Sequence, residues 1–211
     1  MNFPKRFSHW TFRYLIDRIN VQWYEYKHPD FPWLTKTSFE LLISLMTKED
    51  IGLEWGSGRS TLWFAKNVKG LTSVENNLEW YKKNSHTLNK MNLKNVTYIY
   101  ESDIQSGENS NYVQICNNFA PDSLDFILVD GTLRDYCALA SLKILKPNGV
   151  LIIDNANLYL PSNSRSPNSI GKHEDAVSDI WKKFIHEVES WRCIWTTNGV
   201  FDTAIFFKTH L

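Results

Sequence analysis

The residues whose types and spacing point most clearly to a ligand site lie in the segment LEWGSGRST, residues 53–61. A strand-like run leads into Gly56, Ser57 and Gly58, and a helix-like sequence follows them. Two glycines allow the backbone to turn sharply and to approach a ligand closely. Ligands of open α/β sheets bind where the strands end. The segment therefore predicts a strand, a ligand-binding turn and a helix.

Two neighbouring residues indicate the charge of that ligand. Glu54 lies two positions before Gly56, where a carboxylate would repel the pyrophosphate of NAD and would attract a sulfonium or an ammonium group. A dinucleotide fingerprint G-x-G-x-x-G that begins at Gly56 needs glycine at position 61, but that residue is Thr61. The pattern therefore favours a cationic ligand over NAD.

Acidic residues also follow the next two strand-like segments. Glu75 ends LTSVE beside Asn76, and a carboxylate at that position can accept both hydroxyl groups of an adenosine ribose. Asp103 follows VTYIY, within reach of an adenine amino group, although acids in such loops also cap turns. Because several cofactors carry adenosine, these residues do not separate one such cofactor from another.

A second polar group follows the fourth and fifth strand-like segments. Asp130 lies in VDGTLRD, and Asp154 and Asn155 lie in IIDNA. If these strand ends adjoin, the two carboxylates repel each other unless a proton, a cation or a donor separates them. A Mg²⁺ ion, a cationic ligand or the nearby Arg134 would each relieve that repulsion.

Arg134 and a histidine are the remaining candidates for a catalytic role. The guanidinium of Arg134 could clamp an anionic substrate group, or it could pair with Asp135 or Glu101. His173 lies in the polar stretch 161–175 and is the best histidine candidate for a base. A loop of that length in a compact domain is usually functional or disordered.

The elements that would position these residues alternate between strand and helix. Alternation of this kind is typical of parallel βαβ units in a doubly wound α/β sheet. Only a few residues join the last two strands, too few for a parallel crossover, so that pair must be antiparallel. The expected strands are 51–55, 71–75, 96–100, 124–130, 149–154, 191–197 and 203–208, and the expected helices between them are 60–68, 78–88, 134–145 and 177–188.

Two helices are expected before the sheet. Pro29 and Pro32 end the first helix, and Thr37 with Glu40 forms a capping-box pattern that predicts the start of the second. We expect these helices, together with the 161–175 loop, to cover the substrate side of the site. The apolar residues of the first helix fall on one face and are Phe12, Leu15, Ile16, Ile19, Trp23 and Tyr26.

Composition and charge limit the classes of partner that the chain is expected to bind. The chain has 211 residues, with 23 basic and 23 acidic, so it has no general attraction for nucleic acid or for an acidic membrane. We interpret the basic residues of the N-terminal stretch as a solvated helix face. Three scattered cysteines fit a reducing cytoplasm, and neither a signal peptide nor an apolar span of about 20 residues is present. The basic residues are Lys5, Arg6, Arg13 and Arg18.

On these motifs the sequence resembles the class I S-adenosylmethionine-dependent methyltransferases over roughly residues 35–208. Glu54, Gly56 and Gly58 match the first motif of that family, Glu75 matches its acidic second motif, and the antiparallel last strand is its departure from dinucleotide folds. A closer resemblance is to a bacterial subgroup often linked to glycan or secondary-metabolite biosynthesis, usually without an assigned substrate. It is carried by PWLT, LEWGSGRSTLWFA, SVENNLEWY, VDGTLRDYCALA and LKPNGVLIIDNA.

The resemblance implies a seven-stranded Rossmann-like sheet with helices on both faces. The expected organisation is an N-terminal helical cap over residues 1–34 and a methyltransferase domain over residues 35–211. The expected cofactor contacts are Glu54, Gly56, Ser57, Gly58, Glu75, Asn76, Asp103 and Asp130.

Asp130, Asp154 and Asn155 are similar to the metal site of catechol and caffeoyl-CoA O-methyltransferases, which implies three oxygen ligands for Mg²⁺. Those enzymes carry a lysine base three residues after the first aspartate, where this chain has Leu133 followed by Arg134. Arginine stays protonated and is a poor base. We therefore favour a metal-independent enzyme in which Asp130 faces the methyl group and Arg134 holds the substrate.

The predicted function is in-line transfer of a methyl group from S-adenosylmethionine. The Asn/Asp-Pro-Pro-aromatic motif of amino-methylating DNA enzymes is missing, and so is a Pro-Cys nucleophile. These absences favour O-methylation of a small molecule or a sugar. Two alternatives remain, an NAD-dependent oxidoreductase and a non-catalytic ligand-binding protein on the same fold.

Overall fold

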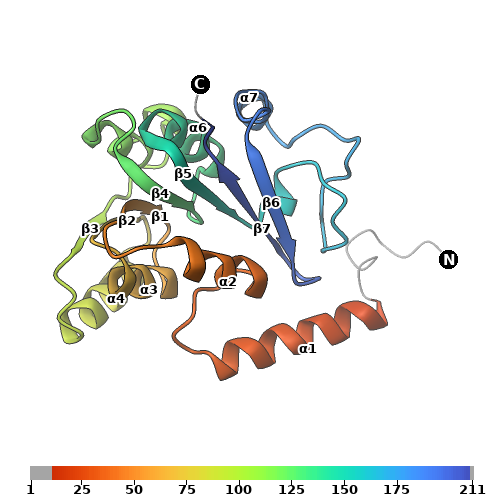
Figure 1. Cartoon of the computed structure of the whole chain (residues 1–211), viewed down its shortest axis with the longest axis horizontal. Helices are drawn as coiled ribbons and strands as arrows, with labels where there is room; N and C mark the ends of the chain where they lie inside the picture. The colour runs from red at the N-terminus through yellow and green to blue at the C-terminus, as the bar shows by residue number, and fades with distance from the viewer. Residues whose placement is uncertain (1–10, 210–211) are drawn as a thin grey trace.

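A computed structural model describes residues 11–209 and contains a seven-stranded sheet flanked by helices (Figure 1). The order of the strands across the sheet is β3-β2-β1-β4-β5-β7-β6. The chain order reverses between β1 and β4, which is where open α/β sheets bind ligands. The strands are β1 (Ile51–Trp55), β2 (Gly70–Glu75), β3 (Val96–Tyr100), β4 (Leu124–Val129), β5 (Leu145–Asp154), β6 (Arg192–Thr197) and β7 (Asp202–Phe207).

The predicted strand directions are confirmed. β1 to β5 pair in parallel, whereas β7 is antiparallel to both β5 and β6. Residues 198–201 join β6 to β7 through a turn closed by a hydrogen bond from Asn198 N to Phe201 O, at 3.3 Å. A link this short leaves no room for a crossover, so β7 must run back beside β6.

Helices cover both faces of the sheet, as predicted. The side chains of β4 show this arrangement, because Phe126 and Leu128 pack with α2 and α3, whereas Ile127 and Val129 pack with α5, α6 and α7. All four side chains are fully buried, which is why the strand reads as a continuous apolar run. The helices are α1 (Phe12–Lys27), α2 (Lys36–Leu45), α3 (Arg59–Asn67), α4 (Leu78–Lys90), α5 (Asn111–Gln114), α6 (Arg134–Ile144) and α7 (Asp179–Glu187), with short 3₁₀ turns η2 (Gly107–Asn109), η3 (Ile115–Asn118) and η4 (Ala156–Leu158).

The first helix forms as predicted, but its apolar face points away from the sheet. α1 lies beside α2 and the β6–β7 turn, at the edge of the molecule (Figure 1). It buries one residue, Val21, on the side opposite its apolar stripe. The stripe residues of the sequence pattern are all exposed. Lys5 and Arg6 of the predicted basic group lie outside the described residues.

The predicted capping box at the start of α2 is wrong. The helix begins two residues earlier than that pattern implies, with Thr35 in place of Thr37 as the N-terminal cap residue. The hydroxyl of Thr35 donates to Ser38 Oγ at 2.8 Å and also contacts Thr196 Oγ1, and its backbone N–H donates to Thr203 Oγ1. These bonds to β6 and β7 fix the start of the helix, and no local sequence pattern reveals them.

The 161–175 stretch is a loop, as expected, with a single β-bridge between Ser162 and Gly171. No helix within the described part of the chain has the length and apolar character needed to cross a membrane.

Candidate functional site

The turn between β1 and α3 packs directly on the turn that follows β4. Gly56 has a φ of +92°, and a Cβ built on it would lie 2.5 Å from the backbone nitrogen of Gly131. Only glycine satisfies both requirements. Gly58 differs, because its φ is 177° and a Cβ there would meet nothing within 4 Å. The second glycine therefore leaves open space beside the turn.

Glu54 lies beneath this turn and is fully buried. Its Oε2 accepts hydrogen bonds from Thr61 Oγ1 at 2.5 Å and from Ser73 Oγ at 2.6 Å, and Thr61 Oγ1 in turn accepts from Gly58 N at 2.9 Å. Its Oε1 is buried and has no hydrogen-bond partner among the described residues. One oxygen thus holds the turn, while the other remains an acceptor without a donor.

Burial raises the pKa of Glu54 to about 7, although the hydroxyls around it oppose the shift and the nearby Asp130 adds to it. A carboxyl group with this pKa is only about half ionised at pH 7. A cation placed beside it would favour the ionised form.

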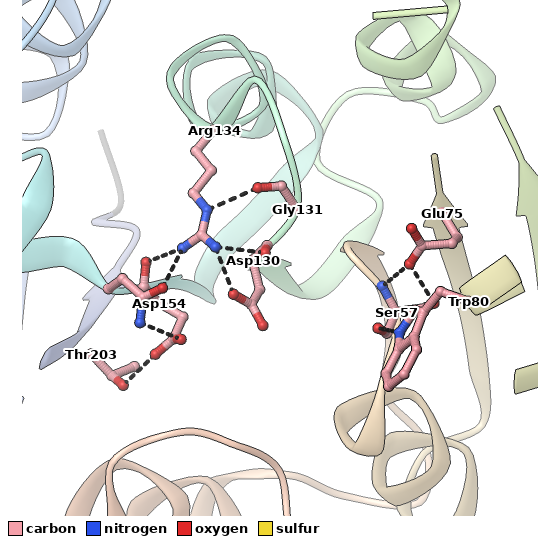
Figure 2. A network of polar contacts seen from close by, with 9 residues as sticks. Ser57, Glu75, Trp80, Asp130, Gly131, Arg134, Asp154 and Thr203 are labelled. Atoms are coloured by element: carbon pink, nitrogen blue, oxygen red, sulfur yellow. Dashed lines mark hydrogen bonds and ion pairs between the residues drawn. The ribbon is translucent and has the colours of Figure 1, made fainter. Parts of the chain in front are cut away.

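Glu75 links the end of β2 to the same turn. Its Oε2 accepts from the backbone N–H of Ser57 at 3.1 Å and from the Ser57 hydroxyl at 2.7 Å, and its Oε1 accepts from Asn77 N at 2.8 Å. The indole of Trp80 donates to the carbonyl of Ser57 from the other side at 2.5 Å (Figure 2). Glu75 and Trp80 thus fix the backbone N–H and carbonyl of Ser57 at the mouth of the turn, and both oxygens of Glu75 already accept hydrogen bonds.

The other two predicted cofactor contacts lie further along the strand ends. Asp103 uses both carboxylate oxygens to accept from the backbone, at Gln105 N and Asn111 N, so it caps the turns of its loop. Asn76 lines an open cleft of about 510 Å³ that also includes Gly131, Thr132, Leu133, Arg134, Asp135, Tyr159, Val177 and Trp181.

Arg134 ties the ends of β4 and β5 together. Its Nε donates to Gly131 O, its Nη1 donates to Asp154 O and Asn155 Oδ1, and its Nη2 donates to Asp130 O and Asp130 Oδ1 (Figure 2). A guanidinium has five N–H groups, and these bonds account for five. Its side chain is 13% exposed.

This geometry revises the expected partners of Arg134. The ion pair forms with Asp130, at 2.9 Å, and not with Asp135 or Glu101. All five N–H groups of Arg134 already donate to protein oxygens, so Arg134 could bind a substrate only by breaking one of these hydrogen bonds. The clamp also spans two strained turns, because Leu133 has a φ of +48° and Asn155 a φ of +50°.

The carboxylates of Asp130 and Asp154 lie close together, as predicted, and Arg134 partly relieves their mutual repulsion. Burial raises the pKa of Asp130 to about 6, with Arg134 opposing the shift. Burial and then the neighbouring Asp130 raise the pKa of Asp154 well above its usual range. Asp154 accepts from Thr203 Oγ1 at 2.9 Å and from Asn155 Nδ2 at 3.0 Å. Of the oxygens expected as metal ligands, Asp130 Oδ1, Asn155 Oδ1 and both carboxylate oxygens of Asp154 already accept protein hydrogen bonds. No group of three His, Cys, Asp or Glu among residues 11–209 is arranged to hold a metal ion.

His173 is not brought into this network. It is exposed on the 161–175 loop and makes no hydrogen bond or ion pair with another described residue. The other end of that loop faces α1, since Asn163, Ser164 and Arg165 line a cleft with Arg13 and Tyr14.

Sequence reasoning missed the residues that hold the site in place. Thr61 was noted only because it is not glycine, yet its hydroxyl joins Gly58 to Glu54. Ser73 and Thr203 contact Glu54 and Asp154 from neighbouring strands. A buried hydroxyl inside an apolar strand was the available signal for both, because such groups need a partner.

Fold and site together define a doubly wound α/β protein with a candidate ligand site at the carboxyl ends of β1, β2, β4 and β5. No family model and no curated protein matches the sequence.

Solved structures are more informative. The chain is similar to a Streptococcus mutans protein assigned as a methyltransferase and solved in complex with SAH (S-adenosylhomocysteine), with 13% identity, a TM-score of 0.55, and coverage of 82% of this chain and 96% of that one. It is also similar to a methyltransferase from Geobacter sulfurreducens (10% identity, TM-score 0.55, coverage 92% and 89%). A third is an rRNA methylase from Streptococcus thermophilus (14% identity, TM-score 0.54, coverage 82% and 95%). At these identities the likeness establishes the fold, and the chain has the class I methyltransferase fold.

Proposed function

We propose that this protein is an S-adenosylmethionine-dependent methyltransferase that acts on an oxygen atom of a small molecule or a sugar. The observation that carries the proposal is Glu54, which is buried under the glycine turn with one oxygen lacking a partner. A buried carboxylate is costly to ionise when one of its oxygens has no donor, and a cationic ligand at the turn would offset that cost. The SAH complex of the Streptococcus mutans neighbour supports the same ligand class.

The residues present fit this cofactor. The space beside Gly58 admits a ligand next to the turn, Glu54 offers negative charge, and Glu75 lies at the end of the adjacent strand. Ser57 and Asn76 would complete the ribose side, and Asp103 the adenine side. When bound, the cofactor would supply a methyl group on a positively charged sulfur.

Asp130 is the proposed catalytic residue of the chain. Arg134 holds its Oδ1, and its Oδ2 has no hydrogen bond among the described residues. With a pKa of about 6, this carboxylate is ionised at neutral pH and close enough to neutrality to accept a proton from a substrate hydroxyl. Arg134 acts as a positioning residue, and His173 remains a second candidate base. Because Arg134 already bonds to oxygens of Asp130 and Asn155, we propose that no metal is required.

The cap of residues 1–34 and the 161–175 loop are proposed to border the substrate. Equal numbers of basic and acidic residues favour a small substrate over the RNA named for the Streptococcus thermophilus neighbour.

Calorimetry with S-adenosylmethionine, SAH and NAD tests the cofactor. We expect binding of both adenosyl ligands and none of NAD. The Glu75→Ala variant should bind more than tenfold more weakly, because hydrogen bonds to a charged acceptor contribute about 1.5–3 kcal/mol each. Glu79→Ala removes an exposed acid four residues away and is the matched control. Preferential binding of NAD would contradict the proposal and favour an oxidoreductase.

The affinity for S-adenosylmethionine should depend on pH through Glu54. A cation favours the ionised carboxylate, so binding should weaken as the pH falls below about 7, towards tenfold per pH unit. Calorimetry across that range measures it. Glu54→Gln should bind weakly at every pH and lose the dependence, while its free energy of unfolding at pH 8 stays at or above that of the native chain. A flat profile in the native protein would remove Glu54 from the ligand site.

A further inference from the structure

The outward face of α1 is apolar and exposed. Its side chains recur with the spacing of one helical face, and each is between 42% and 80% exposed. They are Phe12, Leu15, Ile16, Ile19, Trp23 and Tyr26. The helix holds to the protein through its other side, where Val21 is buried and Tyr24 and Glu25 are half-buried. An exposed patch of six large apolar side chains on one helix face indicates a surface that another molecule covers in the functioning protein.

The charges of α1 are sorted around this face. At 100° per residue, Arg18 lies along one edge of the stripe, and Lys27 and Arg13 lie along the other. All three are exposed. The two acids, Asp17 and Glu25, lie on the opposite side and are half-buried against the body. Arg13 is already paired with Asp17, at 3.7 Å between Arg13 Nε and Asp17 Oδ2, whereas Arg18 and Lys27 have no ion pair with another described residue. The two cations without an ion pair therefore lie one on each edge of the apolar face.

We propose that the outward face of α1 docks onto a membrane surface that contains anionic lipids. A helix with Trp, Phe and Leu on one face and cations at its borders lies in the plane of the interface, with the apolar groups inserted below the headgroups. Trp23 and Tyr26 suit this depth, because their rings are apolar with a polar edge. The ammonium of Lys27 already lies over the ring of Trp23, 4.8 Å from its centroid, and can reach a headgroup beside it.

A second copy of the chain fits this face less well. Two helices paired through the stripe about a twofold axis would bring the cationic edges of each against the cationic edges of the other. Arg18 and Lys27 have no ion pair with another described residue that would neutralise them, and like charges held that close repel each other. An anionic lipid surface instead complements both Arg18 and Lys27.

Docking in this orientation leaves the inner side of α1 free. That side lines a cleft of about 390 Å³ with Arg59, the residue that follows the glycine turn, and with Phe201 of the β6–β7 turn. Trp23 and Lys27, at one edge of the outward face, also line this cleft. One edge of the docked face would thus border this cleft.

The test is sedimentation of the full chain with vesicles of phosphatidylcholine, with and without phosphatidylglycerol. We expect the chain to bind the anionic vesicles and to release them at high salt. Ile19→Glu should weaken binding more than tenfold, whereas Ile43→Glu, which makes the same change at an exposed residue of α2, should bind like the native chain. The double variant Arg18→Gln, Lys27→Gln should also lose at least tenfold, since each cation near an anionic surface contributes about fivefold.

Analytical ultracentrifugation of the same proteins without lipid completes the experiment. A native chain that ignores anionic vesicles, or an Ile19→Glu variant that binds them as well as the native chain does, overturns the proposal. A concentration-dependent dimer that forms in place of vesicle binding and is lost in Ile19→Glu would assign the face to a second copy.

Discussion

Replacing Gly56 by alanine should destabilise the protein by about 3 kcal/mol or more. The positive φ of +92° disfavours any residue with a Cβ by about 1–2 kcal/mol. The added methyl would also lie 2.5 Å from Gly131 N and 2.7 Å from the carbonyl carbon of Asp130, both of them backbone atoms that cannot rotate away. Forcing such contacts apart costs about 1–3 kcal/mol. Chemical denaturation measures the change.

Gly58→Ala is the matched control for this change. Its φ of 177° is open to every residue, and its Cβ would enter empty space, so its free energy of unfolding should change by less than about 0.5 kcal/mol. If that space holds the cofactor, the same variant should bind S-adenosylmethionine at least tenfold more weakly. Equal destabilisation by the two substitutions would show that the turn adopts another conformation.

The fold follows closely from local sequence patterns, because each element has one dominant signal. The apolar runs of β1, β4 and β5 are buried on both faces, and the short β6–β7 link forces antiparallel pairing. The start of α2 was misjudged because its cap residue, Thr35, is fixed by contacts to Thr196 and Thr203. Such contacts join residues more than 160 positions apart and leave no periodic trace in the sequence.

The site was predictable as a set of positions, whereas the bonds within it were not. The rule that ligands bind at strand ends selected Glu54, Glu75, Asp130 and Asp154, and the structure places all four at the carboxyl ends of neighbouring strands. The partners of each carboxylate depend on side-chain directions across the sheet. A motif therefore identified Arg134 as a cation near two acids, but could not show that its N–H groups bind backbone carbonyls.

The apolar stripe on α1 shows a second limit of prediction from sequence periodicity. Periodicity indicates which residues share a face and does not indicate what covers that face. The pattern from Phe12 to Tyr26 would look the same on a helix buried in the core, and the structure was needed to show that it faces outward.

Replacing Arg134 by alanine should destabilise the protein by about 3 kcal/mol at pH 8. The change removes five hydrogen bonds and leaves Asp130 and Asp154 without the cation that they share. Removing one partner of a buried ion pair typically costs about 3–5 kcal/mol, and the lower figure applies because the Asp130 side chain is 31% exposed. Chemical denaturation of both proteins at several pH values measures the loss.

The loss should shrink as the pH falls. Both carboxyls have a pKa above the usual range even with Arg134 present, so their protonated forms are favoured in the folded chain, and stability linked to them is lost as the pH rises through about 6. Without the guanidinium these pKa values rise further. The difference in free energy of unfolding between the native chain and the variant should therefore be largest above pH 6 and smallest near pH 5.

Arg134→Lys separates the charge from the hydrogen bonds. A lysine keeps the cation but offers three donors in place of five, so we expect an intermediate destabilisation that no longer depends on pH. Arg165→Ala removes an arginine from the 161–175 loop and should change stability little. An alanine variant as stable as the native chain at pH 8 would show that the ends of β4 and β5 hold together without the clamp. A pH-independent loss in that variant would assign its effect to the carbonyl bonds alone, with no part played by the two carboxylates.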